Sequence, residues 1–126
     1  MSKINIEATL KSKNETHTFK GKGIKKDNQI IYNDKNVQTK VTIGNEITIE
    51  RKVDQADKVD YHLKINLKKG IIKEGTYITN YGTFNLKTIT INLINQKNEF
   101  KITYKLFIDE TYIDTFTYYL KFTLDT

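Results

Sequence analysis

Arg51 is the only arginine of this chain and the residue best suited to bind an anionic group. Ile47, Ile49 and Val53 share its parity, so a β-strand at this point directs the guanidinium toward the protein interior. A buried guanidinium is costly unless it is paired and hydrogen-bonded, and Asp114 has the parity to be its partner. Two interpretations stay open. Arg51 either closes one end of the fold by bonding carbonyls or stacking on a tyrosine, or it binds an anion in an open mouth.

A second group of polar side chains lies in segment 77–88, which interrupts the alternation seen elsewhere. Tyr77, Thr79 and Tyr81 are expected on one face of a strand, and a glycine follows them. Converging hydroxyls can orient a small ligand, although tyrosines also fill the rim of a core with their hydroxyls in water. The predicted ligand-binding residues are therefore Arg51, Tyr77, Thr79, Tyr81 and, from a later strand, Tyr104.

The sequence gives little support to an enzymatic function. His17 and His62 are not spaced as a catalytic or metal-binding pair, and His62 is expected on an outward face. The chain contains no cysteine, which excludes disulfides and zinc–thiolate sites. It also lacks the nucleophile-elbow, P-loop and dinucleotide-binding motifs. We expect no catalytic residue, no metal, no cofactor and no enzymatic activity.

The charge of the chain is compatible with an anionic macromolecular partner. The net charge is +6 and the isoelectric point is about 9.3. The excess is almost entirely lysine, whereas arginine is preferred for bidentate recognition of phosphates and bases. Lys101, Lys105 and Phe107 share the outward face of one predicted strand, and Lys121 that of the next, which would suit a protein or RNA partner. The ordinary alternative is a solvated lysine surface that protects the strands from aggregation.

Length and composition indicate one all-β domain over residues 1–126. The hydrophobic fraction of 37% is enough for strands that are buried on one face only. The alternation begins directly after Met1, without the continuous apolar stretch of a signal peptide. No run approaches the roughly 18 apolar residues that span a bilayer. We expect a cytoplasmic protein without a membrane span.

Alternating hydrophobicity extends through most of the chain, and no segment keeps a helical period over the length of a stable helix. The clearest predicted strands cover residues 4–10, 37–43, 47–53, 59–67, 100–108 and 116–124. About nine or ten strands joined by short turns favour a single antiparallel up-and-down β-barrel of about 8–10 strands, with little or no helix. Closing the sheet removes its exposed edges. A two-sheet sandwich is the alternative.

Three local features refine this prediction. Gly44–Asn45 indicates a two-residue hairpin connection. Gly21 and Gly23 within one strand indicate a bulge or a sharp bend. The inward parity changes from even at Leu86 to odd at the following isoleucines, which predicts a β-bulge near Lys87–Thr88.

The run from Gly75 to Leu86 resembles the Y-x-T-x-Y-G-x-x-x-L segment of the YwiB-like family of uncharacterised bacterial proteins. Arg51 follows an alternating run, as an arginine does in that family, and Tyr104–Glu110 is similar to its penultimate strand and acidic turn. The family often has a glycine soon after the arginine, which this chain lacks. The resemblance implies a calycin-type, lipocalin-like barrel and no particular activity.

Two functions follow from these observations. The first is a non-catalytic module that binds a small apolar or anionic molecule, or a lipid, between Arg51 and the tyrosines. The second is a protein- or RNA-interaction module that uses the lysine-rich exterior. A continuous interior pocket of roughly 300 Å³ or more would favour the first, and a filled interior with a basic stripe outside would favour the second.

Overall fold

The computed structural model describes residues 1–55 and 58–125, and within these ranges the chain forms ten β-strands and no helix. No described helix could therefore span a membrane. The strands are β1 (Ser2–Lys11), β2 (Thr16–Lys26), β3 (Gln29–Asp34), β4 (Val37–Ile43), β5 (Ile47–Gln55), β6 (Lys58–Leu67), β7 (Ile72–Thr79), β8 (Gly82–Gln96), β9 (Glu99–Ile108) and β10 (Thr111–Leu124).

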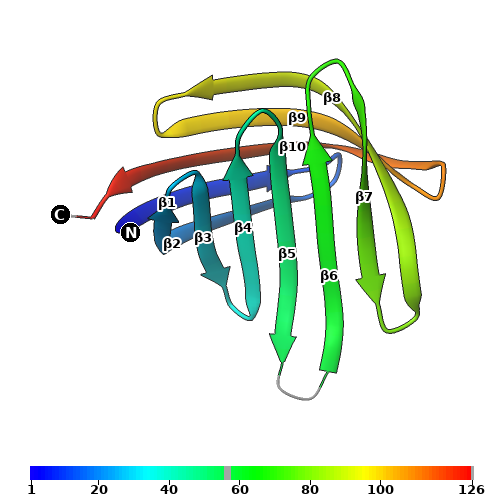
Figure 1. Cartoon of the computed structure of the whole chain (residues 1–126), viewed down its shortest axis with the longest axis horizontal. Coiled ribbons are helices and arrows are strands. Elements are labelled where there is room, and N and C mark those ends of the chain that lie inside the picture. The colour runs from blue at the N-terminus through cyan, green and yellow to red at the C-terminus, as the bar shows by residue number, and fades with distance from the viewer. Residues whose placement is uncertain (56–57, 126) are drawn as a thin grey trace.

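The strands form a closed antiparallel barrel with up-and-down topology (Figure 1). Each strand pairs with the next one along the chain, and β1 closes the sheet by pairing with both β2 and β10. Ala8, for example, lies opposite Phe19 on one side and Leu120 on the other. The predicted all-β barrel is confirmed, and the two-sheet sandwich is excluded.

The two ends of the barrel differ in how densely they are filled. The terminus end carries both chain termini, which Figure 1 shows close together, and the turns at 27–28, 44–46 and 97–98. The mouth end carries the turns at 12–15, 35–36, 80–81 and 109–110. The fully buried core fills the terminus end and the middle, with Ile4, Ile30, Leu67, Phe100 and Leu120 among its members. Most partly buried apolar residues lie toward the mouth end: Leu10, Phe19, Leu63, Tyr77, Leu106, Ile108 and Phe116.

The change of face in β8 lies further along the strand than predicted. The pairing of β8 with β9 is continuous from Leu86 to Thr90, and the register shifts only between Thr90 and Asn92. The predicted bulge near Lys87–Thr88 is therefore wrong. The inward positions before the shift belong to two threonines rather than to isoleucines, and Ile91 is 47% exposed.

Hydrogen bonding explains how a threonine takes an inward position in β8. Thr88 is 1% exposed, and its hydroxyl donates to the carbonyl oxygen of Asn66 at 2.6 Å. This bond links β8 directly to β6, past β7, which lies between them. Nearby on β7, Gly75 faces the Lys64 carbonyl of β6. A Cβ atom on Gly75 would lie 2.3 Å from that oxygen, so the glycine allows the close approach.

The predicted two-residue connection at Gly44–Asn45 needs correction, and at Gly21 and Gly23 the predicted bulge is wrong. The β4–β5 hairpin has three connecting residues, 44–46, because Ile43 pairs with Ile47. An odd connection keeps inward residues opposite inward residues, as the alternation on both strands demands. At Gly21 and Gly23 the pairing with β1 continues without a bulge. Gly23 is instead the first residue of β2 that pairs with β3, so the glycine pair marks the point where these two strands separate.

Candidate ligand-binding site

A cavity of about 250 Å³ opens at the mouth end, beside the separation of β2 and β3. The described pairing of these strands covers only residues 23–26 of β2. The earlier half of β2 therefore leaves β3 and exposes an entrance into the barrel. Ala8, Leu10, Phe19 and Val37 supply apolar walls to this cavity.

Aromatic rings form the inner surface of the cavity. Phe19 stacks on Tyr32 with 4.7 Å between ring centroids and 18° between planes. The Tyr32 and Tyr118 hydroxyls are hydrogen-bonded at 2.6 Å, and both residues are buried. Phe100 packs against the edge of Tyr118 from the core side. The cavity therefore has a rigid, largely apolar floor with two hydroxyls in it.

Arg51 enters the same cavity from β5, as its parity predicts. Pairing places it beside Thr39 on β4 and Leu63 on β6. Its guanidinium carbon lies 5.5 Å from the centroid of the Tyr118 ring, which is within reach of a cation–π interaction. Among the side chains that the structure describes, those of residues 1–53 and 62–125, no carboxylate forms an ion pair with this guanidinium.

Asp114, the expected partner of Arg51, is used elsewhere. One carboxylate oxygen accepts a hydrogen bond from the Lys13 backbone N–H at 3.3 Å, and the other accepts from the Thr115 N–H at 2.7 Å. A register shift between Tyr112 and Asp114 accompanies this arrangement. The prediction of an Arg51–Asp114 pair is therefore wrong.

The buried phenols near Arg51 stay neutral at physiological pH. Burial raises the pKa of Tyr104 to about 12, although the Arg51 charge lowers it. Burial, together with the Tyr32 hydroxyl, raises the pKa of Tyr118 well above its ordinary value, and the Arg51 charge again opposes the shift. Neither phenol can therefore balance the arginine as a tyrosinate.

A histidine–aspartate pair joins the separated strands at the entrance. His17 on β2 contacts the Asp34 carboxylate on β3 through its Nε2 atom. The histidine side chain is 65% exposed and that of Asp34 is 23% exposed. The pair spans the region where the two strands share no backbone ladder, and it commits the one carboxylate that lines the described cavity.

The other predicted site residues divide into two groups. Tyr104 is 4% exposed and stacks on Phe116 at 5.7 Å, and its hydroxyl senses the Arg51 charge. Tyr77 lies in the same cross-strand row as Arg51, since Arg51 pairs with Leu63 and Leu63 pairs with Tyr77. These two tyrosines line the interior on the side of Arg51 away from the entrance.

Thr79 and Tyr81 belong to the β7–β8 turn instead. The Thr79 hydroxyl accepts from the Tyr81 backbone N–H at 3.0 Å and donates to the Gly82 carbonyl at 3.2 Å. Tyr81 is 95% exposed. The expected face shared by Tyr77, Thr79 and Tyr81 is therefore wrong at Tyr81, because the strand ends at Thr79 and the turn directs the next side chains to solvent.

Sequence reasoning missed the closest neighbours of Arg51. Thr39 could have been found, because the odd hairpin connection places it opposite Arg51. Tyr32, Tyr118 and the His17–Asp34 pair carry no local signal, since strands distant in the sequence bring them together. Among the described residues, no three histidine, aspartate or glutamate side chains form a group that could hold a metal ion.

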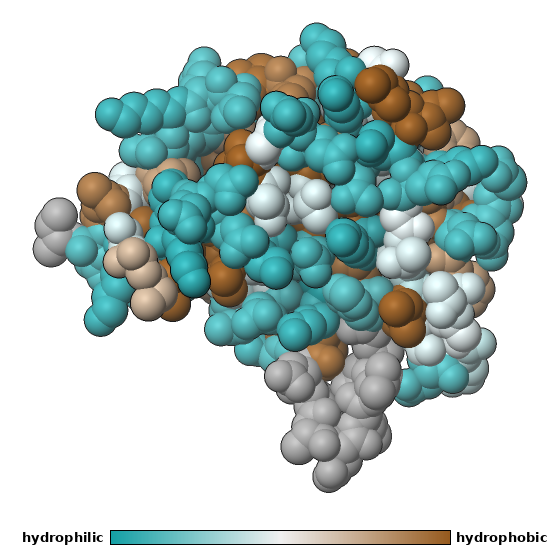
Figure 2. All heavy atoms as spheres, viewed as in Figure 1, coloured by the Kyte–Doolittle hydropathy of each residue, from teal (hydrophilic) through white to brown (hydrophobic). Residues whose placement is uncertain are grey.

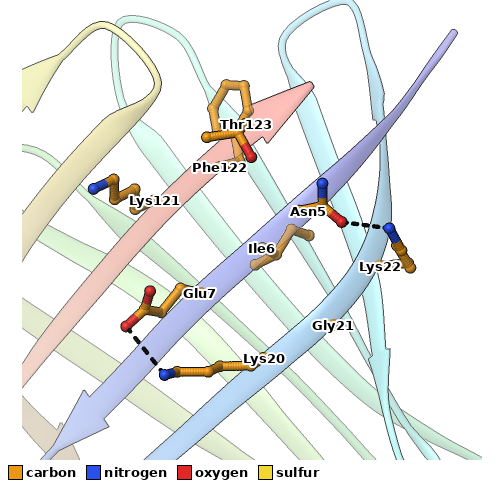
Figure 3. Close-up of a pocket in the computed structure, with 9 residues that line it drawn as sticks. All are labelled: Asn5, Ile6, Glu7, Lys20, Gly21, Lys22, Lys121, Phe122 and Thr123. Carbon is orange, nitrogen blue, oxygen red and sulfur yellow. Dashed lines mark hydrogen bonds and ion pairs between the residues drawn. The ribbon is translucent and has the colours of Figure 1, made fainter. Parts of the chain in front are cut away.

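A larger hollow, about 390 Å³, lies on the outer wall over β10, β1 and β2 (Figure 3). Two of the three lysines that line it, Lys20 and Lys22, have partners. Figure 3 shows Lys20 reaching Glu7, at 3.9 Å, and Lys22 reaching Asn5, at 2.6 Å. Lys22 also pairs with Asp125 at 3.1 Å. Opposite charges on neighbouring strands therefore stabilise this part of the wall, and Lys121 adds a positive charge to the hollow.

Comparison with known proteins identifies the fold. The crystal structure of the ywiB protein from Bacillus subtilis superimposes with a TM-score of 0.58, covering 94% of this chain and 89% of that one. The chain has a YwiB-like fold. The two sequences are 16% identical, so the likeness establishes the barrel and nothing about activity. No protein-family model matches the chain, and no curated protein matches it.

Proposed function

We propose that this YwiB-like barrel is a non-catalytic binding protein for a small molecule that carries one anionic group and a short apolar part. The observation that supports it best is Arg51, a partly buried cation on a cavity, which has no carboxylate partner among the described side chains of residues 1–53 and 62–125. A guanidinium in this position favours an incoming carboxylate or phosphate, since charge-assisted hydrogen bonds are strong where water is partly excluded.

Neighbouring groups reinforce the preference for an anion. Tyr32 and Tyr118 line the cavity, and since only one hydroxyl proton is used in the hydrogen bond between them, the other can be donated to a ligand. The Asp34 carboxylate is occupied by His17 and faces the solvent-exposed rim. An anionic group would therefore meet one cation and one hydroxyl donor at the inner end of the cavity.

Cavity size and wall chemistry limit the rest of the ligand. The volume of about 250 Å³ falls below the roughly 300 Å³ at which drug-sized ligand sites begin. The interior is thus neither filled nor large, and it suits a small ligand. Leu10, Phe19 and Val37 would pack against its apolar part.

We propose no catalytic role for the cavity. The titratable base on the cavity is His17, and we assign its contact with Asp34 to closing the gap between β2 and β3. We also propose that the chain is a member of the YwiB-like family, with its calycin-type architecture; the similar barrel and the motif run from Gly75 to Leu86 support this. A cytoplasmic location stays a prediction. Lys20 and Lys22 of the exterior hollow are paired and add little to the RNA-binding alternative, which depends on Lys101, Lys105 and Lys121.

Titration calorimetry with simple probes tests the proposal. Hexanoate and benzoate should bind with one site per chain, and the neutral hexanamide and benzamide should bind at least tenfold more weakly, since a lost charged hydrogen bond is worth about 1.5–3 kcal/mol. Arg51→Gln should abolish the preference for the acid. Lys52→Gln is the matched control, because it removes one charge from the adjacent, exposed residue. Equal binding of acid and amide, or an equal loss in both variants, would refute the proposal.

A further inference from the structure

An exposed aliphatic patch lies on the outside of the barrel, at the terminus end. Four isoleucines form it: Ile71, Ile72, Ile91 and Ile94, with exposures of 48%, 60%, 47% and 44%. Ile72 pairs with Ile89, and Lys69 bridges to Thr90, so the β6–β7 connection lies directly against β8. Figure 2 shows hydrophobic side chains along this edge, over β8 and the β6–β7 connection. We call these four residues the isoleucine patch.

Four lysines surround the patch and have no acidic partner among the side chains that the structure describes. Lys68 and Lys69 precede it in the β6–β7 connection, Lys101 lies opposite Ile94, and Lys105 lies opposite Ile89. None of the four forms an ion pair with a described residue, whereas Lys20, Lys22, Lys73 and Lys87 do. Four lysines whose charge is not used in such an ion pair therefore lie where the isoleucines are exposed.

The β6–β7 connection holds this chemistry in a fixed shape. The last described β6–β7 strand pair is Lys64 with Thr76, β6 continues to Leu67, and the chain turns over residues 68–71. The Ile71 backbone N–H donates to the Lys68 carbonyl at 3.2 Å, and Gly70 has a φ of 83°, which favours glycine. The corner thus presents two lysines and two isoleucines next to each other.

We propose that this face binds the surface of an anionic lipid bilayer, with the isoleucines inserted at the boundary of headgroups and acyl chains and the lysines at the lipid phosphates. Exposed aliphatic side chains flanked by lysines suit such a surface. A second copy of the chain would bring like charges together. The patch also lacks the Trp, Tyr and Arg anchors typical of protein interfaces and the aromatic platforms that bind nucleic acid. It lies at the end opposite the ligand cavity, so the two sites can be tested independently.

Vesicle sedimentation tests the inference on the full chain. We expect binding to vesicles of phosphatidylcholine and phosphatidylglycerol in equal amounts, and none to phosphatidylcholine alone. Lys68→Gln/Lys69→Gln should lower the partition coefficient roughly 30-fold, because each basic residue near an anionic surface contributes about 1 kcal/mol. Ile72→Ser should lower it roughly tenfold, since burying an isoleucine side chain is worth about 1.5 kcal/mol or more.

Matched controls distinguish binding through this patch from an effect of the protein's overall charge or hydrophobicity. Lys20→Gln/Lys22→Gln removes the same charge from paired lysines, and Ile113→Ser removes an isoleucine that is 47% exposed at the other end. Both should keep binding, and circular dichroism checks that every variant is folded. Absence of binding to anionic vesicles, equal binding to neutral ones, or an equal loss in the controls would overturn the inference. A dimer in light scattering that Ile72→Ser abolishes would overturn it in favour of a second copy.

Discussion

The hydrogen bond between the Tyr32 and Tyr118 hydroxyls defines the floor of the ligand cavity and offers a quantitative test of it. The hydroxyl oxygens are 2.6 Å apart, and the residues are 5% and 1% exposed. Replacing either tyrosine with phenylalanine leaves the other hydroxyl buried without its partner. Replacing both removes the polar pair and keeps the shape of the rings.

The free energies follow from this asymmetry. Each single variant should lose about 1.5 kcal/mol of unfolding free energy, the cost of one buried unsatisfied hydroxyl. The double variant should lose about 1 kcal/mol or less, because removing both partners of a hydrogen bond is nearly neutral. Additive losses would total about 3 kcal/mol, so the cycle should give a coupling of about 2 kcal/mol.

Urea unfolding followed by far-ultraviolet circular dichroism measures all four corners of this cycle, with the denaturant slope as a check that each variant unfolds alike. The stacking of Phe19 on Tyr32 and the Arg51 contact with Tyr118 need only the rings, so they should survive every substitution. Losses that add within about 0.5 kcal/mol would refute the reasoning, since they would mean that the hydroxyls do not bond to each other.

Three further predictions concern the barrel interior. Thr90→Val should raise the free energy of unfolding by about 1 kcal/mol, because the Thr90 hydroxyl is buried without a partner in the described chain, while Thr88→Val should lower it by about 1–2 kcal/mol through loss of its hydrogen bond; urea melts compare them. The pKa of Tyr104, raised to about 12 from 10.0 by burial, means that the folded state holds this proton more tightly than the unfolded state. The free energy of unfolding should therefore be unaffected by Tyr104 below about pH 10 and fall by roughly 3 kcal/mol as the pH rises toward 12. Urea midpoints measured against pH should show this fall in the parent protein, and Tyr104→Phe should remove it. Gly75→Ala should destabilise the barrel by about 2 kcal/mol or more, because a Cβ atom would lie 2.3 Å from a backbone oxygen, whereas Gly44→Ala, with its nearest neighbour at 3.8 Å, should be tolerated in a thermal melt.

The barrel could be predicted because alternation is a local property. The alternation within each strand indicates which of its faces points inward. Ten such strands joined by short turns form an up-and-down sheet, and this sheet closes into a barrel. The same logic could have corrected the β4–β5 connection. With Ile43 and Ile47 both inward, only an odd number of connecting residues places inward side chains opposite each other.

The position of the face change in β8 could not be read from hydrophobicity. An isoleucine is the more apolar choice for an inward position, yet Thr88 is inward because its hydroxyl bonds to a carbonyl on β6. That partner is reached only once β6 and β8 approach each other around Gly75. The preference therefore depends on a contact between strands that are not neighbours in the chain.

Candidate site residues were predictable to a similar extent. The inward direction of Arg51 follows from its parity, and Tyr104 near it follows from the inward face of its own strand. The aromatic residues that share the cavity with Arg51 could not be predicted in this way. Tyr118 and Phe19 come near the arginine only because the sheet closes between its first and last strands. The turn that exposes Tyr81 also escaped prediction, since alternation alone does not reveal where a strand ends.

The central claim is that Arg51 binds an anion inside the mouth cavity, and its uniqueness in the sequence allows one direct measurement. A proton–nitrogen NMR spectrum of the labelled protein contains a single arginine Nε–Hε signal, which reports this guanidinium alone. Titration with hexanoate should shift that signal saturably and slow the exchange of its proton with water, and hexanamide should leave it unchanged. An arginine signal that stays fixed through saturating hexanoate, or that moves equally with the amide, would contradict the account.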